Sequence, residues 1–173
     1  MLTEPVSLED HALGRLDSAV TLVQYGDYAC ADTRQWWVGI QALQIQHAGR
    51  LLLVFRHFPR ASIHPNARLA AAAAEAAATQ GEFWTMHNHL LNHQAALGPE
   101  ELRMHARDLG LDTGRFERDR ASADVAARIE RDVTSGTRSG VKATPALFVN
   151  SIPHDGPRTL ESLRAALLAA GLG

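Results

Sequence analysis

The stretch Thr21-Leu-Val-Gln-Tyr-Gly-Asp-Tyr-Ala-Cys-Ala-Asp-Thr-Arg34 contains Cys30, the only cysteine of this 173-residue chain. It begins with apolar and β-branched residues, passes a Gly-Asp turn and places Cys30 directly before a sequence of helical type. Unpaired N–H groups and the helix dipole at a helix N-terminus favour an anion, so a thiolate is stabilised there. The stretch therefore predicts a strand that delivers a reactive thiol to the start of a helix.

A second thiol is absent from the turn that follows. Thr33 stands where dithiol redox proteins carry the second cysteine of a Cys-x-x-Cys motif. A hydroxyl can donate a hydrogen bond to a thiolate but cannot form a disulfide, so dithiol exchange within one chain is excluded. The carboxylate of Asp32 partly opposes thiolate formation, and the sequence leaves the net effect on the thiol open. The alternative interpretation is that Cys30 is a small buried side chain without chemistry.

The composition is that of a single globular domain with a sizeable core, since 46% of the residues are hydrophobic. A net charge of -2 gives no basic surface for nucleic acid. The apolar runs are too short to cross a membrane. The N-terminal residues lack the pattern of a signal peptide, and one cysteine permits no internal disulfide. We therefore expect a cytoplasmic protein with neither nucleic acid nor membrane as a partner.

Apolar runs and helical periodicity alternate along the chain and predict an α/β fold. A strand, a helix and a strand come first, which implies parallel pairing with a right-handed crossover. Several helices and a final strand, hairpin and helix follow, while residues 1–19 are expected to be an irregular lead-in. The expected strands cover 20–25, 51–56 and 146–150. The expected helices cover 34–47, a long region that starts at His64-Pro65 and includes the alanine run 70–78, then 82–93, 99–109, 113–121, 123–133 and a segment that begins after Thr159.

Five short motifs occur in a fixed order: Asp27-Tyr-Ala-Cys30, Arg56-His-Phe-Pro59, His64-Pro65, Gly81-Glu-Phe-Trp84 with Met86-His87, and Gly140-Val-Lys-Ala-Thr-Pro145. Together they resemble the DsbA-like branch of the thioredoxin superfamily, bacterial thiol–disulfide oxidoreductases with a helical domain inserted in a thioredoxin fold. The resemblance covers the chain from about Leu8 to its C-terminus. It implies a thioredoxin fold (βαβ…ββα), with a thioredoxin-like domain at 1–60 and 137–173 and an inserted helical subdomain at 61–136.

The resemblance also implies roles for individual residues. Cys30 matches the attacking cysteine, and Thr144-Pro145 matches the loop whose cis-proline lies beside that cysteine and presents its backbone to a substrate peptide. Thr33 is the second catalytic candidate, because its hydroxyl could hold the thiolate. Tyr28 and Trp36 are candidate substrate contacts, although Trp36 could equally pack against the inserted helices.

The chain departs from the family pattern at three positions near the cysteine. Besides Thr33, Gln24 stands where many relatives carry a buried Glu that helps to move the proton of the buried thiol. Ala31 replaces the proline that usually follows the first cysteine. The resolving thiol and the proton acceptor are thus missing together, which indicates a coherent loss of dithiol chemistry.

Nine histidines raise the question of a metal site. His89 and His93 lie at i,i+4 with His87 nearby, but no carboxylate or thiol cluster completes a ligand set in the sequence. We expect a histidine-rich solvated face, no metal and no resident cofactor. Asp27 could serve as a general base by type, but no partner for it is fixed nearby in the sequence.

Three functions remain open on these residues. In the first, Cys30 attacks a disulfide or a glutathionylated thiol of a protein or peptide, and an external thiol such as glutathione resolves the intermediate. In the second, the fold is a redox-inactive module that binds peptides or proteins. In the third, the protein is a glutathione-dependent enzyme of the isomerase kind, known for relatives that lack the second cysteine.

Overall fold

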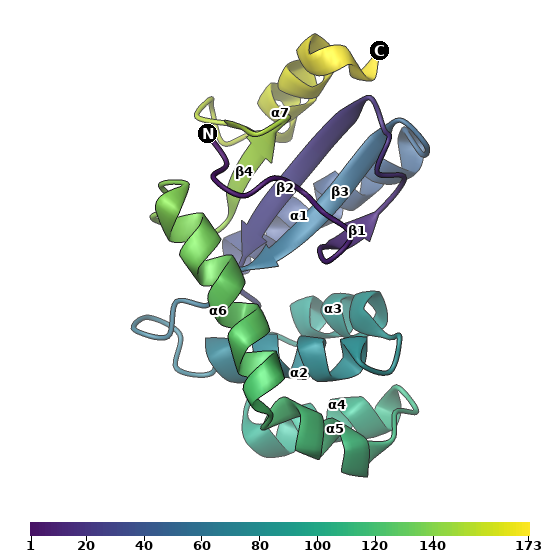
Figure 1. Ribbon diagram of the computed structural model, residues 1–173, viewed down its shortest axis with the longest axis vertical. Coiled ribbons are helices and arrows are strands. Elements are labelled where there is room, and N and C mark those ends of the chain that lie inside the picture. The colour runs from purple at the N-terminus through teal and green to yellow at the C-terminus, as the bar shows by residue number, and fades with distance from the viewer.

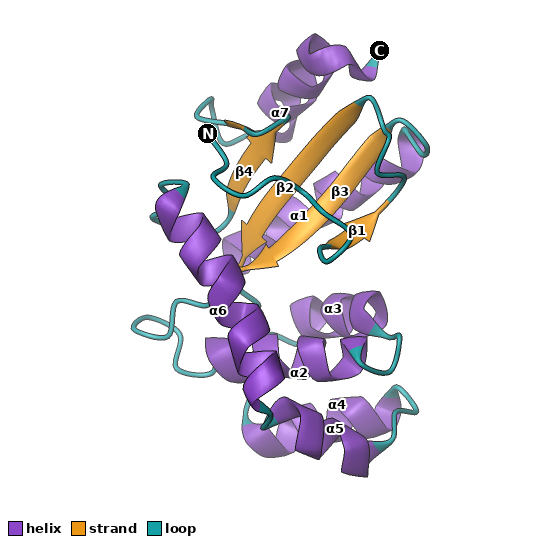
Figure 2. Ribbon diagram, viewed as in Figure 1, coloured by secondary structure: helices purple, strands orange, loops and turns teal.

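Five strands form one sheet in the order β1-β3-β2-β4-β5 in the computed structural model, which describes residues 1–173 (Figure 2). Strands β2 and β3 are parallel, and every other neighbouring pair is antiparallel. The parallel pair confirms the expected strand–helix–strand unit. The strands are β1 (His11–Leu13), β2 (Val20–Gly26), β3 (Leu51–His57), β4 (Ala146–Val149) and β5 (Ile152–Pro153).

Helices α2 to α5 gather at one end of the sheet, below it in Figure 1, and α6 runs from them along the sheet toward β4. Helix α1 lies behind the sheet, and α7 lies above it in the same view. No helix combines the length and the apolar character needed to span a bilayer. The helices are α1 (Ala31–Gln46), α2 (Ala67–Ala78), α3 (Phe83–Asn92), α4 (Pro99–Asp108), α5 (Thr113–Arg120), α6 (Ala123–Arg138) and α7 (Leu160–Leu167), which continues into a π-helical turn over Leu168–Leu172.

Strand β2 is buried on both faces. Val20 and Leu22 belong to the main core, together with side chains from α1, α7 and the inserted helices. Val23 and Tyr25 point to the other face and pack in a second, smaller cluster. Because β2 is central and covered on both sides, its apolar run is continuous rather than alternating, as expected from the sequence.

The lead-in over residues 1–19 is not wholly irregular, which corrects our expectation. Residues 11–13 form β1, which pairs antiparallel with β3. Asp10, directly before β1, accepts hydrogen bonds from the buried Arg56 Nε and Nη2 at 2.8 and 3.0 Å. Only three residues long, β1 gives too short a pattern to stand out in the sequence, and the ion pair joins segments that are distant in the chain.

Three helices differ in extent from the prediction. Helix α2 begins at Ala67, after the N-cap Asn66, rather than at Pro65. Helix α1 begins at Ala31 rather than Arg34, because Cys30 itself is the N-cap. Helix α6 continues to Arg138, beyond the expected end at Val133. A Cβ atom at Gly136 would lie 2.8 Å from the Phe58 ring and 3.0 Å from the Tyr25 ring, so this glycine allows close packing instead of ending the helix.

The alanine run of α2 is explained by close helix packing. Ala70, Ala73, Ala74 and Ala77 are fully buried and belong to the main core. Small side chains on several faces let α2 lie against more than one neighbouring helix at once. The subdomain at one end of the sheet is thus organised around α2.

Candidate active site

Cys30 is the N-cap of α1, with an extended backbone at φ -89° and ψ 118°. Its carbonyl accepts the N–H of Arg34, and its own N–H donates to the carbonyl of Asp27 at 3.1 Å. The side chain is partly exposed. The strand-to-helix turn therefore holds the sulfur at the N-terminus of α1.

The Thr144–Pro145 loop faces Cys30 from a distant part of the chain. The Thr144–Pro145 peptide bond is cis, and both residues are buried. The Cys30 Sγ–H donates to the Thr144 carbonyl oxygen at 3.4 Å. This contact belongs to the protonated thiol, since a thiolate has no hydrogen to donate, so the sulfur gives up this bond when it attacks.

Thr33 lies in the first turn of α1 and makes no hydrogen bond to the Cys30 sulfur, contrary to the contact we expected. Its side chain is fully buried, and its Oγ1 accepts the N–H of Asp27 at 3.3 Å. The hydroxyl therefore stabilises the backbone before Cys30. Gln24 is also fully buried, and both polar atoms of its amide lack a partner.

Tyr28 does not present its side chain to a substrate, which corrects our expectation. Its ring is 1% exposed, and its hydroxyl shares a 2.9 Å hydrogen bond with His87 Nδ1. Burial raises the pKa of Tyr28 well above its ordinary value and lowers the pKa of His87 well below its own. Both groups are neutral in the core, so only the backbone of Tyr28 belongs to the active-site turn.

Asp27 is a functional residue whose partners the sequence did not reveal. Its buried carboxylate accepts the N–H of Ala29 at 2.8 Å, the N–H of Arg60 at 2.9 Å and His64 Nδ1 at 2.8 Å. Two of these donors come from the loop between β3 and α2. The Phe58-Pro59 and His64-Pro65 motifs belong to this loop, which packs onto the turn that precedes Cys30.

Gln94 is a second residue that the sequence analysis missed. Its Nε2 donates to the carbonyl of Tyr28 at 2.7 Å and to the carbonyl of Cys30 at 2.9 Å. Gln94 lies between α3 and α4, so the inserted helices hold the active-site turn directly. Nothing in the local pattern around Gln94 marks it, because its role depends only on tertiary packing.

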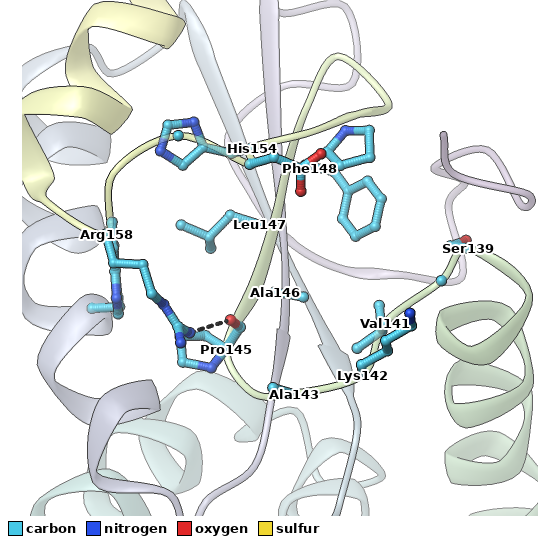
Figure 3. A pocket seen from close by; sticks show the side chains of 15 residues that line it. Ser139, Val141, Lys142, Ala143, Pro145, Ala146, Leu147, Phe148, His154 and Arg158 are labelled. Carbon is cyan, nitrogen blue, oxygen red and sulfur yellow. Dashed lines mark hydrogen bonds between the residues drawn. The ribbon is translucent and has the colours of Figure 1, made fainter.

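A groove with a volume of about 460 Å³ runs beside Pro145 (Figure 3). Trp36 lines it and also packs against the main core, whereas Trp37 is buried and stacks on Trp84. Arg158 donates from Nη2 to the Pro145 carbonyl at 3.1 Å, which Figure 3 marks with a dashed line. In Figure 3 the exposed Lys142 lies to the right of Pro145 and Arg158 to its left, and Asp155 also lines the groove, so the groove presents two cationic groups and one carboxylate.

Two of the three histidines singled out from the sequence lie together, and the third lies apart from them. His89 Nε2 lies 3.0 Å from His105 Nδ1, and the His93 ring stacks on His89, but His87 is buried elsewhere against Tyr28. The structure instead brings together a set that the sequence did not indicate, His11, His57 and Glu75. Its members come from three different elements.

A cysteine at the N-terminus of the first helix, faced by a cis-proline loop and set on a β1-β3-β2-β4-β5 sheet, defines the thioredoxin class of proteins. The family model described as "Thioredoxin" matches residues 7–169. The chain belongs to this family.

Solved structures share the fold over nearly the whole chain. A thioredoxin-like oxidoreductase from Silicibacter pomeroyi DSS-3 superposes with a TM-score of 0.84 at 27% identity, covering 95% of this chain and 93% of that one. BdbD from Bacillus subtilis, in its oxidised form, gives 0.84 at 21% identity over 95% and 94%. The thiol-disulfide exchange protein alpha-DsbA2 from Wolbachia pipientis gives 0.78 at 23% identity over 94% and 87%. The expected DsbA-like thioredoxin fold with inserted helices is confirmed.

Curated relatives carry a different name. Na(+)/H(+) antiporter NhaA 3 from Salinispora tropica is 41% identical over 93% of this chain, and NhaA from Herminiimonas arsenicoxydans is 38% identical over all of it. The chain spans about a quarter of the length of these proteins, at 24% and 28%. The antiporter name refers to these longer proteins as a whole, of which the matched region is only a part.

Proposed function

We propose that the chain is a monothiol, Cys-x-x-Thr thiol–disulfide oxidoreductase of the DsbA-like kind, with Cys30 as the nucleophile and an external thiol as the resolving group. The observation that carries the proposal is the partly exposed Cys30 sulfur at the N-terminus of α1, 3.4 Å from the carbonyl before Pro145. The 27% identical Silicibacter pomeroyi protein, described as a thioredoxin-like oxidoreductase, supports the same class.

The proposed reaction is a pair of exchanges that balance without a second cysteine. The Cys30 thiolate attacks the glutathione sulfur of a protein–glutathione mixed disulfide, forms a Cys30–glutathione disulfide and releases the protein thiolate, which takes up a proton. A second glutathione thiolate attacks this intermediate, releases oxidised glutathione and restores Cys30. Glutathione supplies the two electrons, so the proposal places the protein in a reducing compartment, the cytoplasm.

The loop and groove have separate roles in this proposal. The backbone at Thr144 and Pro145 aligns the substrate chain next to the sulfur, and Trp36 forms part of the groove wall. Arg158 and Lys142 favour substrates with carboxylates close to the disulfide, as in glutathione. Thr33 acts as a positioning residue, through the Asp27 N–H and not through the sulfur.

The test is incubation with oxidised glutathione followed by mass measurement of the intact chain. We expect one reversible glutathione adduct in the wild type, which reduced glutathione removes, and none in Cys30→Ser. We also expect deglutathionylation of a model glutathionylated peptide with turnover. A Cys30 that forms no adduct contradicts the proposal and leaves the binding-module alternative.

Thr33→Cys tests the alignment of the active-site turn. Because Thr33 occupies the position of the resolving thiol, this variant is expected to form an internal disulfide on mild oxidation, read out as the loss of both free thiols. The matched control is Thr33→Ser, which keeps one thiol and should form only the glutathione adduct. Two free thiols in oxidised Thr33→Cys would show that residue 33 does not face the sulfur.

A further inference from the structure

Three side chains from three elements meet where the sheet adjoins the inserted helices. His11 lies in β1, His57 ends β3, and Glu75 lies in α2. The Nε2 atom of each imidazole is 2.7 Å from the same carboxylate oxygen, Glu75 Oε1, and the three atoms lie within 4.8 Å of one another. The proposed exchange at Cys30 uses none of them.

We propose that His11, His57 and Glu75 form a zinc site. Two imidazole nitrogens and one carboxylate oxygen are a ligand set that binds Zn²⁺ and leaves the fourth tetrahedral position for water. Bonds of about 2.0–2.2 Å to zinc require ligand atoms roughly 3.3 Å apart, so each imidazole nitrogen has to move away from Glu75 Oε1 by a fraction of an ångström.

The surroundings of the cluster hold the ligands in place. The His11 ring stacks on Phe83 with centroids 3.4 Å apart, and the His57 ring packs edge-on against Phe55 at 5.5 Å. The side chains of His57 and Glu75 are 1% and 7% exposed, whereas that of His11 is 17% exposed. Metal and water therefore reach the site past His11, and the other two ligands are preorganised in the core.

The guanidinium groups nearest to the cluster pair with Asp132 rather than with Glu75. Arg128 Nε approaches Glu75 Oε1 to 3.9 Å, but its guanidinium also forms an ion pair with Asp132. The second oxygen of Asp132 accepts the N–H of His57 at 2.9 Å. Arg131 Nε also lies 4.0 Å from Asp132 Oδ1, so Asp132 pairs with both guanidinium groups. No guanidinium is within hydrogen-bond distance of Glu75 Oε1, the oxygen that both histidines contact.

Other zinc-binding groups on the chain have to be separated from this site. Cys30 can bind zinc through its sulfur, and His89, His93 and His105 lie close together on the inserted helices. In that second group His93 Nδ1 is bonded to the carbonyl of His89, and the three rings do not converge on one point as the proposed ligands do. Cys30→Ser and His93→Gln are therefore the matched controls.

The experiment titrates the full chain with Zn²⁺ by calorimetry and with Co²⁺ by visible absorption. We expect one site per chain, a tetrahedral Co²⁺ spectrum without a thiolate charge-transfer band, and a raised Tm with Zn²⁺. Glu75→Gln and His11→Gln should each lower the affinity for Zn²⁺. The loss should exceed the roughly 10- to 100-fold loss that follows when only a supporting hydrogen-bond partner of a ligand is removed. Circular dichroism checks that each variant is folded, and His11→Gln, at the partly exposed ligand, provides a second test if Glu75→Gln does not fold.

Cys30→Ser and His93→Gln should bind Zn²⁺ as the wild type does. Wild-type protein that binds no metal overturns the proposal, as does a folded His11→Gln variant with unchanged affinity. Loss of the site in His93→Gln would move it to the surface histidines, and loss in Cys30→Ser would move it to the sulfur. The proposed exchange is measured separately by the glutathione adduct, so either proposal can fail without the other.

Discussion

At the scale of single residues, the site depends on a carboxylate that performs no chemistry in our proposal. Asp27 is buried, and its two oxygens accept three hydrogen bonds, from Ala29, Arg60 and His64. Each of these donors would lose its partner if the carboxylate were removed, and unsatisfied buried groups are costly. Asp27 therefore fixes the turn on which Cys30 stands.

Asp27→Ala is expected to lower the free energy of unfolding by about 3 kcal/mol, since it leaves three donors without an acceptor. Asp27→Asn keeps one carbonyl oxygen and should lose less. Urea unfolding followed by circular dichroism measures both. The control is Asp17→Ala, which removes an exposed ion pair with Arg15 and should leave stability unchanged. Equal unfolding midpoints for Asp27→Ala and the wild type would contradict this account.

The active-site turn also receives two hydrogen bonds from Gln94. Without them the carbonyls of Tyr28 and Cys30 lose a protein partner, and the sulfur is less well positioned against Thr144. Gln94→Ala is expected to slow glutathione exchange at Cys30 about tenfold. Gln80→Ala is the matched control, because Gln80 bonds the backbone of Asp112 in the inserted helices, and it should exchange at the wild-type rate. Stopped-flow kinetics with equal rates for the two variants would exclude this positioning role.

At the scale of elements, the sequence predicts those strands and helices that have a clear apolar pattern. The buried strands β2 and β3 and the helices of the insertion were expected within a few residues of their observed bounds. Cys30 and the Thr144–Pro145 loop were paired in advance only because their motifs resemble a family. The short strand β1, the partners of Asp27 and the role of Gln94 were missed, since each depends on contacts between distant segments and leaves no periodic pattern.

Gly136 shows how a glycine inside a helix can serve close packing. Inside α6 its missing side chain makes room for Phe58 and Tyr25, so Gly136→Ala should cost about 1–3 kcal/mol through overpacking. Gly114→Ala is the matched control in α5, where the nearest atom to a new Cβ lies at 3.4 Å. There alanine should instead add up to about 1 kcal/mol through its higher helix propensity. Thermal unfolding of the two variants should therefore shift in opposite directions.

At the scale of the whole molecule, buried titratable groups make stability depend on pH. Burial holds the pKa of His87 well below its ordinary value of about 6.5. For Asp10, burial opposes ionisation, but the hydrogen bonds from Arg56 and from the Ser7 backbone, together with the charges of Arg56 and Arg128, outweigh it and lower the pKa. In both cases the unfolded chain binds protons more readily than the folded one, so acid favours unfolding.

We expect the free energy of unfolding to be highest near neutral pH, to fall below about pH 6.5 as the unfolded histidine protonates, and to fall further below about pH 4 through Asp10. His87→Gln should flatten the first part of this decline by up to about 1.4 kcal/mol per pH unit. Urea unfolding at several pH values between 7.5 and 4 measures the slopes. An unchanged slope between pH 6.5 and 5 in His87→Gln would show that other groups cause the decline.

The bonds that cross from the helices to the catalytic loop limit how this protein can be shortened or recombined. Removing residues 61–136 to leave a minimal thioredoxin would delete both His64 and Gln94, and would expose the oxygens of Asp27, Tyr28 and Cys30 that they now satisfy. Conversely, a Cys-x-x-Thr loop transplanted into a scaffold without these donors would not keep its shape. The loop and the helical insertion therefore have to be exchanged between relatives as one cassette.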